Sequence, residues 1–461
     1  MMGQGRSLEV VFNGQVMGDL TEAGDIWAFG YRDEWLASPN AFALSPAIDT
    51  AQAQHVDGST QRPLQWFFDN LLPEEGLRLV VSKEQKVPEG DAFGLLARLG
   101  AESAGSLVLR SAGEEGAPTG STQLTQESLS GRIRGLGRTS LNAGSPKRMS
   151  LAGAQHKMVV LYDPVTGELR EPLQGSASSH ILKPNSTAEG YPHSVINEVF
   201  TMRLARRLGL NVPQVHLLYV PEPVYIIDRF DRELDPVAGE WQRLHVLDAC
   251  QLLNLPRRDK YQAASIATLK TLIGLCREKM VTRVALFQWL VFNTLIGNSD
   301  AHLKNLSFLM SPKGVQLAPF YDLLSTAVYH TRVYADEHAV WPRESLVIPL
   351  GGASTFEEVT HSSLVTAGVE LGLAHATAQR IVGAFVRALP KQAAEVAKEL
   401  SAGWRGPGSK DATPGAAAAH EHLLRAVRHI VIGDTVARCN APATATRSNT
   451  GAQKGNEHDA P

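Results

Sequence analysis

The chain opens with short apolar runs separated by turn residues, a pattern typical of β-strands. Apolar positions in residues 8–12 and 16–20 flank Asn13-Gly14, a dipeptide that favours a tight hairpin because both central residues of the turn need positive φ. A third strand-like run covers residues 26–31, and apolar residues at helical spacing follow until about residue 105. We therefore predict a small α+β domain over residues 1–111.

Residues 112–146 change character, because they are rich in Gly, Ser and Thr and hold few large apolar side chains. This composition predicts a flexible linker. A loose basic cluster lies in this segment and just beyond it: Arg132, Arg134, Arg138, Lys147 and Arg148. A solvated linker is the simpler interpretation of these charges, and an arm that contacts an anion is the alternative.

Regular patterns resume near residue 147 and predict a small lobe that extends to residue 230. Residues 157–162, 180–183, 214–220 and 224–228 have the pattern of strands, and Ile196, Phe200, Leu204 and Leu208 form one apolar stripe of a helix. Apolar residues in 231–439 mostly keep helical spacing, which predicts a helical lobe. The polar tail, residues 440–461, is expected to be disordered.

Composition narrows the class of protein. With 461 residues and a formal charge of −3, the chain lacks the large basic excess of a protein that coats nucleic acid. No stretch reaches the ~18 apolar residues needed to cross a bilayer, and no secretory leader is evident. The three cysteines lie too far apart for a disulfide framework or a CxxC zinc site. We therefore expect a cytoplasmic protein without a membrane partner.

Candidate chemistry gathers in two polar loops. Asp300 and Asn305 lie five apart after a strongly apolar helical stretch, and Asp322 follows the next strand-like run. Phosphoryl transfer from ATP needs a carboxylate beside the attacking hydroxyl and hard oxygen ligands for Mg²⁺. Asp300 fits the first role and Asn305 and Asp322 the second, while His302 could steady the loop or contact a phosphate. Asp and Asn are also common turn residues, so the spacing alone is equally compatible with two ordinary turns that have no catalytic role.

Two further segments favour a kinase. Lys183 lies inside an apolar strand and needs an anionic partner, which Glu198 on the next helix or the phosphates of ATP could supply. A strand-edge lysine that reaches water is the alternative. In SLAGAQHK, residues 150–157, small side chains would let backbone N–H groups approach phosphates beside Lys157, although an ordinary tight turn is also possible. The segment is neither a Walker A loop nor a GxGxxG motif.

Rival chemistries lack their motifs. The chain contains neither the HExxH motif of zinc proteases nor the G-x-S-x-G elbow of α/β-hydrolases. His420, His422 and His429 cluster in the last predicted helix. Solvated or core-lining histidines are the simpler interpretation of this cluster, and metal ligands are the alternative.

The ordered set of motifs resembles the HipA-type serine/threonine kinases, the toxin components of bacterial toxin–antitoxin systems. The matching segments are SLAGAQHK, HILKP, Asn197-Glu198, RLGLNVP, IDRFDR, DACQLLNLPRRDKY, IGNSDAHLKN and APFYDLLS. The opening hairpin, DNLLPEE and LLARLGAESAGSLVL resemble the N-terminal subdomain of that family. The resemblance implies an α+β, two-lobed protein-kinase-like fold with an added N-terminal α+β subdomain and a helical C-lobe.

The resemblance also implies ATP and Mg²⁺ as cofactors and assigns roles to residues. Asp300 would be the catalytic base, Asn305 and Asp322 would hold the metal, and Lys183, paired with Glu198, would bind the α- and β-phosphates. The other cofactor-binding residues would come from the phosphate loop, the hinge and the catalytic loop: Ala152, Gly153, Ala154, Gln155, His156, Lys157, Asp228, Arg229, Phe230 and His302. Ser150 would be phosphorylated by the enzyme itself, which would eject the phosphate loop.

The implied partners are a helix-turn-helix antitoxin, operator DNA bound mainly through that antitoxin, and a protein substrate such as an aminoacyl-tRNA synthetase. The sequence departs from the family at His156, where some members have Glu, and at Asp228, where the hinge carboxylate is otherwise Glu. Two other functions stay open: a non-catalytic corepressor with a kinase fold, and a kinase that acts on a small molecule.

Overall fold

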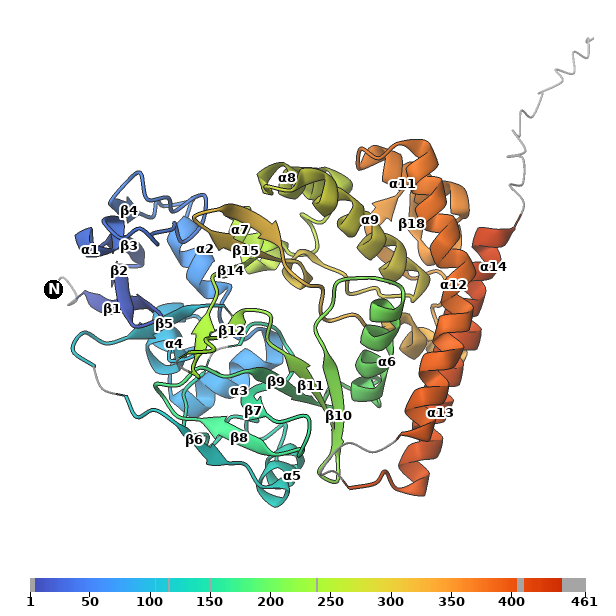
Figure 1. Cartoon of the computed structure of the whole chain (residues 1–461), viewed down its shortest axis with the longest axis horizontal. Coiled ribbons are helices and arrows are strands. Elements are labelled where there is room, and N and C mark those ends of the chain that lie inside the picture. Colours follow the sequence, from blue (N-terminus) through green and yellow to red (C-terminus); the bar gives the residue numbers. More distant parts are fainter. Residues whose placement is uncertain are drawn as a thin grey trace, which may run out of the picture.

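The computed structural model describes residues 5–103, 105–114, 117–149, 151–237, 239–403 and 410–441. Two sheet-rich units occupy one half of the molecule and a bundle of helices occupies the other (Figure 1). This arrangement confirms the predicted α+β fold with a small sheet-based lobe and a helical lobe.

The N-terminal unit is a five-stranded sheet whose strands contact α1, α2 and α4, while α3 packs against α4. The strand order is β4-β3-β2-β1-β5, and neighbouring strands run antiparallel. Asn13 and Gly14 both have positive φ, so the first two strands form the predicted hairpin. The elements are β1 (Arg6–Phe12), β2 (Gln15–Ala23), β3 (Ile26–Tyr31), α1 (Asp33–Leu36), β4 (Gln54–Val56), α2 (Pro63–Asp69), α3 (Glu75–Gln85), α4 (Ala92–Leu99) and β5 (Leu107–Arg110).

The second unit is a six-stranded sheet in the order β10-β11-β9-β7-β8-β6. Side chains alternate between its faces: Leu182 and Ile226 face a small apolar core, whereas Lys183 and Tyr225 face α6. The elements are β6 (Ser121–Gln123), α5 (Gln126–Arg134), β7 (Met158–Tyr162), β8 (Leu169–Pro172), β9 (His180–Pro184), α6 (Ser194–Arg207), β10 (Val215–Tyr219) and β11 (Pro223–Asp228).

The prediction of a flexible linker over residues 112–146 is wrong for much of that segment. Strand β6 pairs with β8 and helix α5 follows it, so this stretch is part of the small lobe. Its widely spaced leucines, Leu124, Leu129 and Leu141, are buried in the apolar core of that lobe. The segment lacks a local apolar pattern because each of its leucines enters the core alone, between strands that are distant in the sequence.

The basic cluster of this segment divides into enclosed and exposed residues. Arg132 forms a two-pronged hydrogen bond with the carboxylate of Glu171, at 2.8 and 2.9 Å. Lys147 lies 2.7 Å from the buried carboxylate of Glu102. Arg132 and Lys147 therefore bind partners within the chain, whereas Arg134, Arg138 and Arg148 are exposed, as the interpretation of solvated charges expects.

The remaining residues form the helical lobe, with small hairpins at its junction with the sheets. Its long helices are α9 and α12, and α6 of the small lobe packs against α12 (Figure 1). The elements are β12 (Arg232–Leu234), β13 (Trp241–Arg243), β14 (Val246–Asp248), α7 (Ala249–Leu252), α8 (Ile266–Leu275), α9 (Lys279–Leu295), β15 (Ser307–Ser311), β16 (Gly314–Leu317), α10 (Arg332–Ala335), β17 (Ser345–Leu350), β18 (Ala353–Thr355), α11 (His361–Glu370), α12 (His375–Ala402), α13 (Pro414–Ala426) and α14 (Gly433–Asn440).

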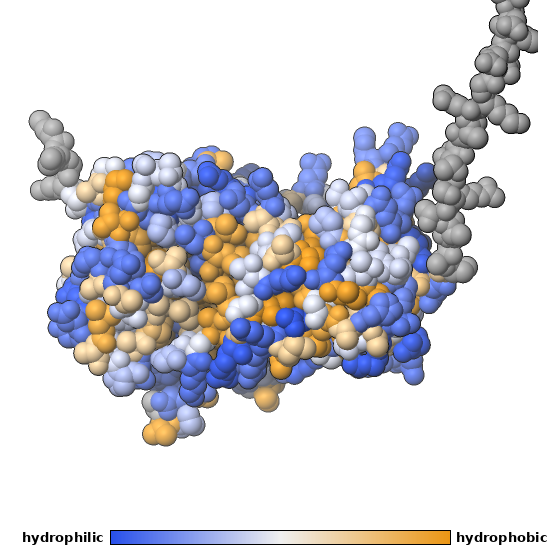
Figure 2. Space-filling view, turned by 90° about the horizontal axis from the view of Figure 1, so that it is seen from above, coloured by the Kyte–Doolittle hydropathy of each residue, from blue (hydrophilic) through white to orange (hydrophobic). Residues whose placement is uncertain are grey.

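The end of the chain differs slightly from the prediction. Asn440, the first residue of the predicted tail, is the last residue of α14, and residues 442–461 lie outside the described part. In the described ranges no helix is both long and apolar enough to cross a membrane. The face shown in Figure 2 mixes hydrophilic and hydrophobic residues, with hydrophobic ones gathered across its middle.

A buried charge cluster joins the N-terminal unit to the segment that links the two lobes. Glu102 is fully buried and its carboxylate contacts four cations within 3.0 Å: Lys147, Arg229, Arg232 and Arg243. Burial alone would raise the pKa of Glu102, but the surrounding cations outweigh it and hold the pKa well below its ordinary value. The carboxylate is therefore ionised in the folded protein and ties three segments together.

Replacing this carboxylate tests how much it contributes to the stability of the fold. The isosteric change Glu102→Gln leaves four buried cations without their shared partner, and we expect the free energy of unfolding to fall by about 3–5 kcal/mol. Urea denaturation followed by circular dichroism measures the change. Glu114→Gln, which removes an exposed pair with Arg148, is the matched control and should have little effect. Equal stabilities of the two variants would contradict the assignment.

Candidate active site

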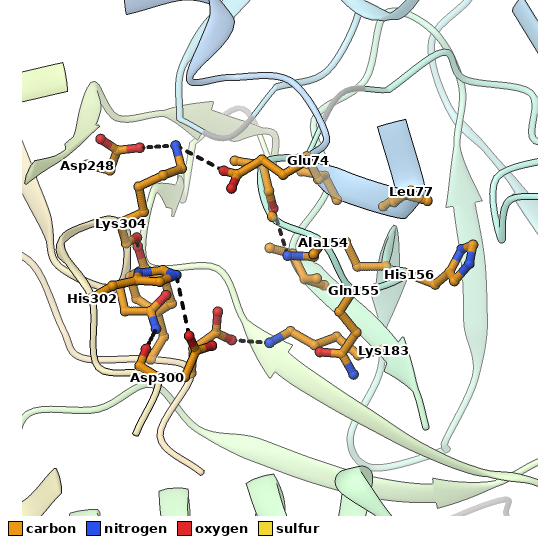
Figure 3. Close-up of a pocket in the computed structure, with 18 of the residues that line it drawn as sticks. Glu74, Leu77, Ala154, Gln155, His156, Lys183, Asp248, Asp300, His302 and Lys304 are labelled. Carbon is orange, nitrogen blue, oxygen red and sulfur yellow. Dashed lines mark hydrogen bonds and ion pairs between the residues drawn. The ribbon is translucent and has the colours of Figure 1, made fainter. Parts of the chain in front are cut away.

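A pocket of about 870 Å³ lies between the sheet units and the helical lobe. It is lined by the start of α3, the loop before β7, strand β9, the end of β11 and the loops after α9 and β16. Figure 3 shows Lys183 and the 154–156 segment on one side of the pocket and Asp300, His302 and Lys304 on the other. The predicted phosphate loop, hinge, catalytic loop and metal loop thus face the same space.

Lys183 is a buried cation that lines the pocket. The alternation of β9 directs it toward α6, where its Nζ lies 2.8 Å from Oε1 of Glu198. The same Nζ also bonds to Oδ1 of Asp322, which comes from the helical lobe, and it lies over the ring of Tyr225. Lys183 and Glu198 are both buried, so this strand lysine does not reach bulk water.

Two carboxylates sharing one ammonium group titrate differently. Burial and the nearby charge of Asp322 raise the pKa of Glu198 to about 7, although Lys183 opposes this. Burial also disfavours the ionised form of Asp322, but Lys183 and Lys157 outweigh it and hold the pKa of Asp322 below its ordinary value. The surroundings therefore favour the ionised form of Asp322 more than that of Glu198.

The loop after α9 presents Asp300 to the pocket. Gly297 has positive φ, and a Cβ there would lie 2.5 Å from Val431, so only glycine fits this turn. The Asn298 side chain accepts a hydrogen bond from the Asp300 N–H at 3.0 Å, and the Asn305 side-chain amide donates one to the Asp300 carbonyl at 2.8 Å. These bonds fix the backbone of the loop on both sides of Asp300.

The Asp300 carboxylate is half exposed in the pocket. The Tyr261 hydroxyl donates a hydrogen bond to it at 2.5 Å, and Nε2 of His302 lies 3.9 Å away. Burial lowers the pKa of His302, despite the charge of Asp300, which favours a neutral ring. The Asp300 carboxylate is thus held by Tyr261 and is still accessible from the pocket.

Asn305 and Asp322 have oxygens that suit a hard cation. The amide nitrogen of Asn305 is engaged with Asp300, and only one oxygen of Asp322 is engaged with Lys183. The amide oxygen of Asn305 and the second carboxylate oxygen of Asp322 have no hydrogen-bond partner within the described ranges. This donor set is of the kind that Mg²⁺ prefers.

The predicted phosphate loop curls around Lys157, whose Nζ donates a hydrogen bond to the carbonyl of Ala152 at 2.7 Å. Gly153 has positive φ and lies so close that a Cβ would come within 2.8 Å of that Nζ. The Gln155 amide donates to the Pro184 carbonyl, next to Lys183. Burial lowers the pKa of Lys157 to about 8, against the attraction of Asp322.

The remaining loop residues differ in exposure. Ala154 is exposed at the tip, whereas His156 is buried and its Nδ1 has no hydrogen-bond partner in the part of the chain that is described. Burial lowers the pKa of His156, which favours a neutral ring. Ser150, predicted as the phosphorylation site, lies outside the described residues.

Sequence reasoning missed an ionic bridge on the far side of the pocket. Glu74, at the start of α3, lies 2.8 Å from Nζ of Lys260 and 3.5 Å from Nζ of Lys304, and Lys304 also lies 2.6 Å from Asp248 (Figure 3). The N–H of Glu74 donates to the carbonyl of Gly153. Glu74 lies in the segment DNLLPEE and Lys304 in the segment AHLKN. These segments are far apart in the sequence, and only the fold brings them together.

The predicted hinge residues line the pocket, while two of their side chains bind elsewhere. Asp228 accepts hydrogen bonds from two histidines of the sheet, and Arg229 belongs to the Glu102 cluster. Phe230 stacks on Tyr321 with ring centroids 5.7 Å apart. The hinge therefore offers mainly backbone groups to a ligand in the pocket.

The histidines near the end of the chain lie away from this pocket. His420 is buried with its ring centroid 5.2 Å from that of His193, and His422 contacts the ring of Tyr334. Neither is part of a metal-ligating group within the described ranges. The interpretation of these residues as core and surface histidines fits their positions.

The architecture and the motifs match one protein family. The HipA N-terminal domain model matches residues 8–110, and the HipA-like C-terminal domain model matches residues 149–393. The chain is 37% identical to the kinase-named protein Y4mE of Sinorhizobium fredii, over 70% of this chain and 78% of that protein. It is 32% identical to the serine/threonine-protein kinase toxin HipA of Shewanella oneidensis, over 70% of this chain and 76% of that protein.

A solved structure agrees with these matches. HipA from the Shewanella oneidensis complex of HipA, HipB and operator DNA superposes with a TM-score of 0.72 at 26% identity, covering 93% of this chain and 99% of that one. Kinase names recur among the relatives, which supports a kinase-type reaction. The two domain models, the sequence relatives and the fold together show that this chain belongs to the HipA family.

Proposed function

We propose that the chain is an ATP- and Mg²⁺-dependent serine/threonine protein kinase that arrests growth as the toxin of a toxin–antitoxin pair. The observation that carries this proposal is the convergence of Lys183, Asp300, Asn305 and Asp322 on one pocket, from segments as far apart as β9 and the loop after β16. Phosphoryl transfer depends mainly on positioning and on electrostatic stabilisation, and these four side chains supply both.

Asp300 is the proposed base. Its carboxylate is accessible, its backbone is fixed by Asn298 and Asn305, and it can accept the proton of an attacking hydroxyl. Asn305 and Asp322 would hold Mg²⁺, which when bound supplies charge neutralisation for the phosphates. Lys183 would turn from Asp322 toward the α- and β-phosphates while Glu198 keeps it in place.

The adenine and the phosphates would lie on opposite sides of the pocket. Backbone groups of residues 228–230 are the proposed adenine contacts, since the Asp228 and Arg229 side chains are engaged elsewhere. Residues 152–157 would cover the phosphates, with Lys157 as their cation and His302 near the transferred group. This division follows the positions of the hinge and the loop in the pocket.

Partners and modification extend the proposal. We propose autophosphorylation on Ser150, a helix-turn-helix antitoxin that connects the chain to operator DNA, and a cytoplasmic protein substrate of the translation machinery such as an aminoacyl-tRNA synthetase. The family membership and the kinship with a HipA that forms a complex with HipB and operator DNA support the antitoxin. The charge of −3 is consistent with DNA contact mainly through a partner.

Two alternatives make different demands on the same pocket. A corepressor without catalysis would not require the four chemical side chains to converge, and a small-molecule kinase would use them on another hydroxyl. Labelled γ-phosphate added to a cell lysate separates the three functions. Label in protein supports the proposal, label in small molecules supports the second alternative, and no transfer supports the first.

Removing the proposed base tests the mechanism. We expect Asp300→Asn to reduce phosphate transfer by at least about 100-fold, because the amide cannot accept the proton of the attacking hydroxyl. A thermal shift with Mg-ATP should persist, since Asp300 is not a proposed metal ligand. Asp336→Asn, at an exposed aspartate that does not line the pocket, is the matched control and should retain activity. Transfer by Asp300→Asn at the wild-type rate would refute this role.

Mass spectrometry tests the modification separately. After incubation with Mg-ATP, the wild-type chain should carry a phosphate on Ser150, and Ser150→Ala and Asp300→Asn should not. Ser128→Ala, at an exposed serine of α5, should behave like the wild type. If phosphate appears on other residues while Ser150 stays unmodified, the proposed site is wrong.

A further inference from the structure

A row of polar and aromatic side chains crosses the sheet of the small lobe on the face opposite Lys183. Tyr162, His180, Asp228 and His216 come from the four neighbouring strands β7, β9, β11 and β10 (Figure 1). His180 lies directly opposite Asp228 in the ladder, and His216, which pairs with Ile226, is the diagonal neighbour of Asp228. The strand ladders therefore hold two imidazoles and one carboxylate in fixed positions.

The three polar groups already have spacings close to those of metal ligands. Nε2 of His180 and Nε2 of His216 each lie 3.1 Å from the same Oδ1 of Asp228. All three ligand atoms lie within 4.8 Å of one another. Zinc bonds of about 2.0–2.1 Å in a tetrahedral site separate neighbouring ligand atoms by roughly 3.3 Å. Small side-chain rotations are therefore sufficient to admit an ion between them.

The surroundings have features of a metal site. The Ser179 hydroxyl lies 2.7 Å from Nδ1 of His180, an outer contact that can orient the ring and leave Nε2 for a metal. The Tyr162 ring packs against both imidazoles, with centroids 5.5 and 5.1 Å away. The Asp228 side chain is 44% exposed, whereas those of the histidines are nearly buried, so the group is enclosed on the histidine side and open at the carboxylate.

We propose that His180, His216 and Asp228 bind one late first-row transition-metal ion of the Zn²⁺ type, with a fourth position open to water. Two imidazoles favour Zn²⁺ and its neighbours, whereas Mg²⁺ prefers an all-oxygen set. The ion would join β9, β10 and β11 at the end of the sheet where the segment between the lobes begins. This proposal does not depend on the kinase function, because the site lies on the opposite face of the sheet from Lys183.

Calorimetric titration of the metal-free full chain with Zn²⁺, in buffer with excess Mg²⁺, tests the site. We expect one saturable equivalent that Mg²⁺ does not displace. His216→Ala and the nearly isosteric Asp228→Asn should each weaken the affinity by at least about tenfold. His375→Ala removes an exposed histidine at the start of α12 and is the matched control, with unchanged binding.

Thermal unfolding supplies the second readout and checks that the variants fold. Zn²⁺ should raise the Tm of the wild type and of His375→Ala, and it should raise that of His216→Ala and Asp228→Asn much less. Circular dichroism without metal establishes that each variant is folded. The proposal is overturned if Zn²⁺ does not bind saturably, or if it binds to both site variants with the same affinity as to the wild type. In either case His180, His216 and Asp228 would form a hydrogen-bonded cluster that does not bind metal.

Discussion

The active-site architecture depends on one buried ammonium group with two carboxylates. Lys183 comes from a strand of the small lobe, Glu198 from the helix packed on it, and Asp322 from the helical lobe. A buried lysine without a partner would lose its charge or destabilise the fold, so this ion pair constrains how the lobes meet. Because Asp322 competes for Lys183, a bound cation that attracts Asp322 would make the lysine available to phosphate. The Lys183–Asp322 contact could thus be exchanged for contacts with a nucleotide.

The N-terminal unit is a structural part of the same site. The Glu102 carboxylate lies in a buried group of cations that includes Arg229 of the predicted hinge. Glu74 bonds through its backbone to Gly153 in the predicted phosphate loop and through its side chain to Lys260 and to Lys304, which lies in the predicted catalytic loop. A displacement of the loop that contains Gly153 would therefore be transmitted through Glu74 to the predicted catalytic loop. This gives a physical reason for a HipA N-terminal domain and a kinase-like domain to share one chain.

Local patterns allowed much of the fold to be predicted. The Asn13-Gly14 hairpin depends on two adjacent residues, and the α6 stripe on a spacing of four, so both are readable from the sequence. The spacing of Asp300, Asn305 and Asp322 and the strand position of Lys183 suggested a kinase site, and the order of motifs in a known family made that prediction specific. Their chemical roles remain predictions, whereas their proximity is a feature of the structure.

Features built from distant segments were not predictable in the same way. Strand β6 and helix α5 have little local apolar pattern and gain their order from Leu124 and Leu129, each buried among strands that come later in the chain. The Glu74–Lys304 bridge joins residues that lie about half the chain length apart in the sequence. His180 and Asp228 become neighbours only through the register of β9 with β11. Such pairings carry no short-range signal, because each residue alone resembles an ordinary surface or turn residue.

The most direct measurement of the central claim is a crystal structure of the chain with Mg²⁺ and a non-hydrolysable ATP analogue. The account predicts Mg²⁺ bound by oxygens of Asn305 and Asp322 at about 2.0–2.1 Å, with Lys183 turned to the phosphates and the adenine against residues 228–230. A pocket that stays empty at saturating analogue, or a nucleotide bound elsewhere with the Lys183–Asp322 pair intact, would contradict it.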